Sequence, residues 1–302
     1  MASFHVCQLR RVSSFPAFVG MAALGNPSAG ETKRHKFVTA GGEIIKTVSH
    51  DLGAFDELRI LPLADLHLGD IRSDFRKIQE YLEYIRTNDN VYCILNGDLM
   101  DCAITASIGD TYGASLQPMQ QLAQCVKIFE PIKDKILLVL PGNHEARIYR
   151  TDGLDMTQLM CNQLMIADRY SPESALLFVR FGRSKVPGRH GRAVLYSIYC
   201  VHGSSGGRME GSKINRLMQL GSIVDADIYV HSHTHLPAVV KSAYFRVCTS
   251  NNSVEKVDKL FVNTAAALDW GGYAELQSYK PASLETPVII LDGARRRMRA
   301  VL

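Results

Sequence analysis

Five apolar segments of this chain end in, or are followed at once by, Asp, Asn or His side chains. Short apolar runs of this kind predict buried strands, and they lie at residues 58–64, 91–96, 135–141, 192–203 and 225–230. The polar residues at their ends are Asp65, His67, Asp98, Asn143, His144, His202, His231, His233 and His235. Ligands of open α/β sheets bind at the carboxyl ends of the strands, so these side chains are expected to meet on one side of a sheet.

Helical segments separate the first strands. Within residues 73–86, apolar side chains recur at helical spacing, at Phe75, Ile78, Leu82 and Ile85. Residues 115–132, 153–167 and 211–222 also predict helices. Beyond residue 167 the chain is richer in strands, with further candidates at 175–182, 259–265 and 286–293. Alternating strands and helices followed by more strands predict a layered α/β domain with two sheets.

The 302 residues are enough for one large domain or two small ones. No repeat, low-complexity segment or linker divides the chain after residue 36, so we expect one domain over residues 37–302, beginning with a hairpin at 37–48. Residues 1–36 are expected to form a disordered leader or a targeting segment. Their basic residues and short apolar run are typical of a signal peptide, but Pro16 and Gly20 interrupt that run. We expect a cytoplasmic protein, with export or organelle targeting as the alternative.

The formal charge of +4 is carried by the leader, where five basic residues stand against Glu31. The rest of the chain is neutral and offers no broad basic track for nucleic acid. The run RRRMR at 295–299 is expected to be a solvated strand or tail. Seven cysteines without a CxxC pair indicate neither a disulfide framework nor a thiolate zinc site. No stretch reaches the roughly 18 uninterrupted apolar residues that a membrane span needs.

The polar residues at the strand ends are metal ligands by type. Asp65 and His67 are two positions apart and face the same way in extended backbone, so both can coordinate one ion. The carboxylate of Asp98 can bridge to a second ion. Carboxylate and imidazole ligands without thiolate favour Mn, Fe, Zn, Co or Ni in a reactive site. Two such ions clamp a phosphate and lower the pKa of a shared water.

Together these motifs resemble the calcineurin-like metallophosphoesterase family over roughly residues 58–240. The family's pattern runs Asp-x-His, Gly-Asp, Gly-Asn-His-Asp/Glu, His and Gly-His-x-His. The corresponding residues here are Asp65 and His67, Gly97 and Asp98, Gly142 to Glu145, His202, and His233 with His235. The chain departs from the pattern at Ser232, where the family usually has Gly. Pro237, two residues after His235, selects His233 and His235 over His231, which is expected to pack at the strand end.

The resemblance implies a four-layer αββα sandwich, two mixed β-sheets flanked by helices. It implies one metal held by Asp65, His67, Asp98 and His235, and a second held by Asp98, Asn143, His202 and His233. His144 would contact the phosphate and protonate the leaving oxygen. Among the other polar residues, Asp70 and Asp101 are expected to be solvated turn acids, and His50 and His190 to be surface residues. Arg208 either reaches a phosphate or lies in a solvated loop.

The expected function is hydrolysis of a phosphoester, as a phosphodiesterase or phosphatase, by a hydroxide that bridges two divalent metal ions. Two alternatives stay open. A nuclease of the same family would need a basic or aromatic groove beside the metals, and Lys213 and Arg216 are too sparse to indicate one. A scaffold with the same fold would have lost metal ligands, and none is missing. Compact sequences of this kind suggest a bacterial or bacteriophage-type member. The sequence leaves the oligomeric state open.

Overall fold

The computed structural model describes residues 45–103, 114–188, 190–204, 207–276 and 278–302, all within the unit Thr32–Leu302. The expected leader, residues 1–36, and most of the hairpin expected at 37–48 lie outside the described residues. The first described strand, β1 (Lys46–Asp51), pairs in parallel with β5 (Ser174–Phe181). Among the described residues, no helix is both long and apolar enough to cross a membrane.

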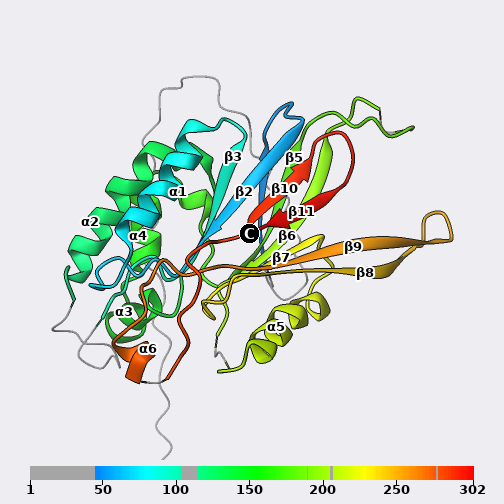
Figure 1. Ribbon diagram of the computed structural model, residues 1–302. Helices are drawn as coiled ribbons and strands as arrows, with labels where there is room; N and C mark the ends of the chain where they lie inside the picture. Colours follow the sequence, from blue (N-terminus) through cyan, green and yellow to red (C-terminus); the bar gives the residue numbers. More distant parts are fainter. Residues whose placement is uncertain (1–44, 104–113, 189, 205–206, 277) are drawn as a thin grey trace, which may run out of the picture. The chain divides into compact units, whose positions relative to one another are not determined.

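The smaller sheet has five strands in the order β11-β10-β2-β3-β4. Its parallel part consists of β2 (Glu57–Leu63), β3 (Val91–Asn96) and β4 (Ile136–Leu140), which the apolar runs predicted. β10 (Val288–Asp292) lies antiparallel to β2, and β11 (Met298–Val301) completes the edge. Helices α1 (Phe75–Thr87), α2 (Pro118–Phe129) and α4 (Met156–Gln163) cover the outer face of this sheet (Figure 1).

The larger sheet has six strands in the order β1-β5-β6-β7-β9-β8. The new strands are β6 (Val194–Val201), β7 (Ile228–His231), β8 (Ala238–Cys248) and β9 (Ser253–Asn263). α5 (Glu210–Gln219) covers its outer face through Leu217, which packs against Tyr229 and Phe261. The inner faces of the two sheets share a core that includes Leu138, Leu177 and Ile198. The fold is therefore the expected α/β sandwich, with helices outside two mixed sheets.

The helices show where local signals were sufficient. In α1, Asp74 caps the first turn by accepting a hydrogen bond from Lys77 N at 2.9 Å, and Ile78, Leu82 and Ile85 are buried as predicted. Phe75, by contrast, is 41% exposed, because it lies in the first turn, outside the packed stripe. The helix expected over 115–132 is interrupted, since α2 gives way to a 3-10 turn at Glu130–Lys135.

The helix expected over 153–167 is shorter and corresponds to α4 (Met156–Gln163). A helix that the sequence analysis did not predict, α3 (Glu145–Asp152), precedes it and ends at Gly153, whose φ of 71° is left-handed and stops helix propagation. Asp155 then caps α4 by accepting from Gln158 N at 2.8 Å. Two 3-10 turns, Ala167–Arg169 and Leu220–Ser222, and the short α6 (Tyr273–Leu276) complete the described elements.

All six cysteines in the described part of the chain are free, and five of them are buried. Burial raises the pKa of the Cys93 thiol to about 12, so it packs as a neutral apolar group.

Candidate metal centre

The polar side chains at the strand ends meet at one edge of the sandwich, contributed by both sheets. They follow β2, β3 and β4 of the smaller sheet and β6 and β7 of the larger one. Their ligand atoms form three overlapping groups, each with all atoms within 4.8 Å of one another. The groups are Asp65, His67 and His235; His67, Asp98 and His144; and Asp98, His202 and His233.

The first group joins the end of β2 to the turn after β7. Asp65 Oδ1 lies 3.2 Å from His235 Nε2, and the rings of His67 and His235 are 5.4 Å apart between centroids. The backbone N–H of His233 donates to Asp65 Oδ2 at 3.0 Å, which fixes the carboxylate across the two sheets. One carboxylate and two imidazoles therefore face a common point.

The group of Asp98, His202 and His233 joins the end of β3 to the residues that follow β6 and β7. His202 Nε2 is 3.1 Å from Asp98 Oδ2 and 3.3 Å from Asn143 Oδ1. The rings of His202 and His233 are 5.4 Å apart between centroids. Asp98 thus contributes to two of the three groups. The structure brings together the four residues expected to hold the second metal, which are Asp98, Asn143, His202 and His233.

Five of these residues adopt left-handed backbone conformations, which are uncommon for residues other than Gly, although Asp and His adopt them more often than most. Their φ angles are 52° at Asp65, 46° at His67, 51° at Asp98, 66° at His233 and 52° at His235. Each such residue costs on the order of 1–3 kcal/mol, and the surrounding structure must hold it there. Such strain gathers at functional sites, because it aims side chains that a relaxed strand end would not.

Two glycines allow the turns to approach one another. A Cβ on Gly97, whose φ is 90°, would lie 2.6 Å from His202 Nδ1, and a Cβ on Gly142 would lie 2.0 Å from Asp98 Oδ1. Neither position has room for a side chain, so both glycines serve the close packing of the site and not only a turn.

Ser232 shows how the chain accommodates its departure from the family's pattern. Its side chain is fully buried, and its Oγ accepts a hydrogen bond from Asn96 Nδ2 at 2.6 Å. The backbone N–H of Ser232 donates to the carbonyl of His202 at 3.0 Å. The extra side chain is therefore satisfied, and it ties the turn after β7 to the end of β3.

Glu145 was not assigned a role from the sequence, yet it organises the turn that carries Asp98. It is buried, and its two carboxylate oxygens accept hydrogen bonds from four backbone N–H groups. The donors are Asp98 N at 3.1 Å, Gly142 N at 2.8 Å, Leu99 N at 2.6 Å and Met100 N at 2.9 Å. An acidic residue directly after Asn143-His144 was the available signal, but only the fold shows what it binds.

His144 is held from both ring nitrogens. Its Nδ1 lies 2.9 Å from the Asp101 carbonyl oxygen and 3.1 Å from Asp101 Oδ1. Arg147 Nη2 lies 3.0 Å from Nε2, and because guanidinium only donates, Nε2 accepts and Nδ1 carries the hydrogen. The expectation that Asp101 is a solvated turn acid is wrong: its side chain is 13% exposed and positions the imidazole.

The charges of the site are strongly coupled. Burial, followed by the charge of His144, lowers the pKa of His67 to about 3, so this imidazole is neutral and free to coordinate. Burial alone would also lower the pKa of His202, but Asp98 and Asp65 outweigh it and raise that pKa to about 10. For His144, the hydrogen bond to Asp101 and the charge of Asp98 likewise outweigh burial and raise the pKa.

The side chains of these groups could hold divalent metal ions. Asp65 Oδ1 and His67 Nε2 are buried and accept or donate no hydrogen bond in the described structure. Buried polar atoms are normally hydrogen-bonded, so two such atoms in one group, with only the ion-pair contact of Asp65 Oδ1 to His235, are suited to holding a cation. The carboxylate and imidazole donors are those of a reactive site for Mn, Fe, Zn, Co or Ni.

The remaining sequence candidates lie outside the three groups. His231 donates from Nδ1 to Asn263 Oδ1 at 2.7 Å and packs at the strand end, as expected. Asp70 is not free in solvent, because it accepts from Arg72 Nη2 at 2.8 Å. His50, expected at the surface, is instead half-buried and lies 2.8 Å from the Leu137 carbonyl oxygen. His190 is exposed, as expected.

Arg208 lies 6.0 Å above the ring of Tyr279, a cation–π distance. Arg208 thus lies beside Tyr279. The three ligand groups consist of Asp and His residues only, so this contact does not link Arg208 to them.

Comparison with known proteins agrees with this geometry. The family model described as calcineurin-like phosphoesterase matches residues 58–237. No curated protein matches the chain. Among solved structures, Vacuolar Protein Sorting 29 from Cryptosporidium parvum is 17% identical with a TM-score of 0.37, covering 82% of this chain and 97% of that one.

Two other solved structures are similar at the same level. A conserved uncharacterised protein from Streptococcus pneumoniae, described as a predicted phosphoesterase, is 15% identical with a TM-score of 0.32, covering 82% of this chain and 91% of that one. GAP50 of Plasmodium, described as the anchor in the inner membrane complex, is 10% identical with a TM-score of 0.41, covering 82% and 84%. At these values the likenesses carry no argument about activity.

Proposed function

Because this chain belongs to the calcineurin-like phosphoesterase family, we propose that it is a metal-dependent hydrolase that cleaves a phosphoester at two divalent metal ions. One observation carries the proposal. Carboxylates and imidazoles from five strand ends form overlapping groups, and two of their buried atoms lack any hydrogen-bond partner. A chain that used this fold only as a scaffold would have no reason to keep strained, unsatisfied ligands.

In this proposal one ion is held by Asp65, His67, Asp98 and His235, and the other by Asp98, Asn143, His202 and His233. The short distances from His202 to Asp98 and Asn143, and from His235 to Asp65, support these sets. When bound, divalent ions neutralise phosphate charge and lower the pKa of water to near neutrality. The donor types allow Mn, Fe, Zn, Co or Ni.

His144 is the proposed catalytic residue. Asp101 accepts the hydrogen of Nδ1, which leaves Nε2 to deliver a proton to the leaving oxygen, and the raised pKa keeps the imidazole protonated nearer neutral pH. Once Nε2 carries a proton, Arg147 can no longer donate to it. The Arg147 guanidinium is then available to donate to a phosphoryl oxygen, which it would approach beside His144.

The proposed substrate is a compact phosphoester, so the enzyme would be a phosphodiesterase or a phosphatase. The neutral body of the chain supports this, because a nucleic-acid track would need more positive charge beside the metals. A nuclease is the second candidate within the same chemistry. Cytoplasmic localisation and a bacterial or bacteriophage-type subfamily stay predictions from the sequence.

The test is metal analysis and hydrolysis by the full-length chain. We expect bound divalent metal and cleavage of bis-p-nitrophenyl phosphate, p-nitrophenyl phosphate or both. Asp98→Asn should lose metal and activity, and His144→Ala should lose activity with the metal retained. Asp168→Asn and His190→Ala are matched controls at exposed positions and should behave as wild type.

Each outcome separates the candidates. Protein that binds no divalent metal and cleaves neither ester would refute the enzyme and favour a scaffold. Cleavage of the monoester alone would identify a phosphatase. Salt-sensitive cleavage of single-stranded DNA would identify a nuclease.

A further inference from the structure

The outer edge of β8 is a long strand edge without a partner among the described residues. β8 is the last strand of the six-stranded sheet and pairs only with β9, through eleven consecutive residue pairs from Ala238↔Asn263 to Cys248↔Ser253. It contains no proline and no bulge. Natural proteins interrupt or cover such edges, because an exposed row of backbone N–H and C=O groups pairs with any strand that reaches it.

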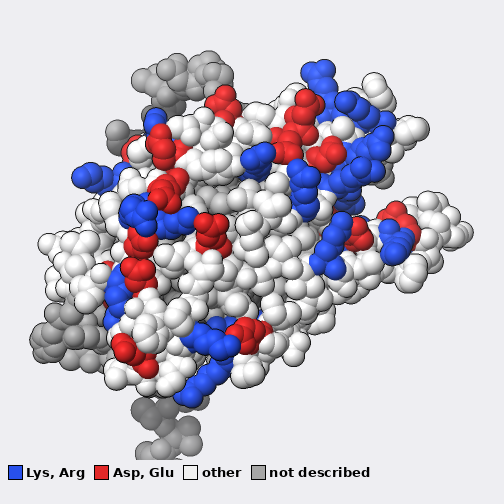
Figure 2. Space-filling view, in the orientation of Figure 1, with Lys and Arg blue, Asp and Glu red and all other residues white. Residues whose placement is uncertain are grey.

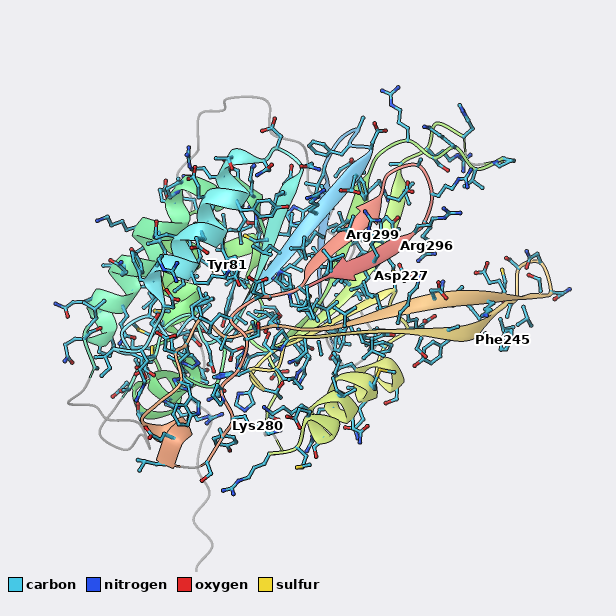
Figure 3. The ribbon with its side chains drawn as sticks, viewed as in Figure 1. Tyr81, Asp227, Phe245, Lys280, Arg296 and Arg299 are labelled. Carbon is cyan, nitrogen blue, oxygen red and sulfur yellow. The ribbon has the colours of Figure 1, made fainter. Side chains whose placement is uncertain are left out.

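The β8–β9 hairpin also carries an exposed apolar surface. Near its base Val239 packs into the core between the sheets. Further along the same face, Phe245 is 79% exposed, Val247 is 69% exposed, and Val254, the cross-strand partner of Val247, is 62% exposed. Figure 1 shows why: β8 and β9 continue beyond β10 and β11, so no second sheet covers this part of the inner face. Figure 3 places Phe245 on that extension.

The extension is fixed in place from its other face. Arg246 Nη2 lies 3.3 Å from Asp225 Oδ1, and Lys259 Nζ lies 5.0 Å above the ring of Tyr244. The end of the hairpin carries few charged side chains in the face seen in Figure 2. The edge is therefore open, and its apolar patch at Phe245, Val247 and Val254 is bordered on the same face by the Lys241–Asp258 ion pair and by Lys256.

We propose that this edge is a homodimer interface, in which β8 of a second copy pairs antiparallel with β8 across a twofold axis at Phe245. In an antiparallel pair, residues directly opposite each other have their side chains on the same face of the sheet. When the two strands are identical, the twofold axis therefore passes between one residue and the same residue of the other copy. An axis at Phe245 stacks two Phe245 rings and sets Ala243 opposite Val247 on the same face.

On the reverse face, the same register sets Tyr244 opposite Arg246 and Ser242 opposite Cys248. Every apolar residue of the exposed face meets an apolar residue, and no like charges are opposed. An axis at Arg246 would instead oppose two guanidinium groups, which is destabilising. The complementarity of the strand with itself is what selects a second copy as the partner. This inference is independent of the proposed hydrolysis.

The first test measures the molar mass of the full-length chain by sedimentation over a range of concentrations. We expect wild type to dimerise and Phe245→Glu to be monomeric, because a twofold axis places the two new charges against each other. Met119→Glu is the control, since Met119 is 66% exposed on α2 and far from β8 in the sequence. Wild type that stays monomeric at the highest concentration would overturn the proposal.

The second test fixes the register. Residues directly opposite in an antiparallel pair have Cβ atoms about 4.5–5.5 Å apart, close enough for a disulfide after small movements. With oxidised glutathione as the two-electron oxidant, Ser242→Cys should form a covalent dimer with the native Cys248 of the other copy. Ser242→Cys combined with Cys248→Ser should not. A dimer that survives Phe245→Glu and gives no such cross-link would use another surface, which would also overturn the proposal.

Discussion

Replacing Glu145 with Gln tests the claim that one buried carboxylate holds the turn bearing Asp98. Oε1 accepts from Leu99 N and Met100 N, and Oε2 accepts from Asp98 N and Gly142 N. Gln keeps one acceptor oxygen and puts an NH₂ group at the other position. Two backbone N–H groups therefore lose their partner, at about 1–3 kcal/mol each.

Part of this loss is recovered, because burial and the charge of Asp98 raise the pKa of Glu145 and a neutral amide avoids that cost. We expect the free energy of unfolding to fall by about 2–4 kcal/mol. Since the same N–H groups position Asp98, metal affinity should also fall, by about 10–100-fold.

The assay is urea unfolding of metal-free protein, followed by circular dichroism, with metal affinity measured separately by calorimetry. Removing the metal first keeps the two effects apart, because bound metal would itself stabilise the fold. The control is Glu173→Gln, at an exposed residue, which should change neither quantity. An unfolding free energy of Glu145→Gln equal to that of wild type would refute the reasoning.

Three further predictions concern groups outside the ligand sets. Asp101→Asn should lower kcat about tenfold or more with bound metal unchanged, and should shift the pH profile, because the pKa of His144 falls when its carboxylate partner is lost. Burial lowers the folded-state pKa of His50 below 6.5, so below about pH 6.5 the unfolded chain binds more protons and stability is lost as the pH falls. His50→Gln should therefore show a smaller loss of unfolding free energy between about pH 7 and pH 5. Tyr196→Phe should cost about 1–3 kcal/mol in thermal or urea unfolding, because its buried hydroxyl lies within 2.9 Å of three carbonyl oxygens at residues 292, 295 and 297 and accepts from Arg297 N; an unchanged stability would show that these groups find other partners.

Much of the candidate site could be read from the chain because its signals are local. A strand that ends in Asp-x-His or Gly-Asp carries its ligand within a few residues of an apolar run. Parallel strands then bring such ends to one edge. Asp65, Asp98 and His202 were therefore placed together without coordinates, and the structure brings them within one set of overlapping groups.

The misjudged residues depend on contacts between distant parts of the chain. Asp101 and His50 were expected in solvent because nothing near them in sequence indicates burial. Asp101 meets His144, 43 residues away, and His50 meets the Leu137 carbonyl, 87 residues away. Similarly, the predicted helix began at residue 153, whereas Gly153 is the left-handed end of α3 and the next helix begins at Met156.

The sequence by itself determined the apolar strands that carry the site, the layered α/β class with two sheets and the candidate metal-ligating side chains, because hydrophobic periodicity and ligand chemistry are properties of short segments. Only the tertiary structure decided how those side chains are aimed, what Glu145 holds, and that β8 extends past the cover of the second sheet. These depend on the packing of two sheets against each other, and the lengths and register of paired strands are set by partners far along the chain.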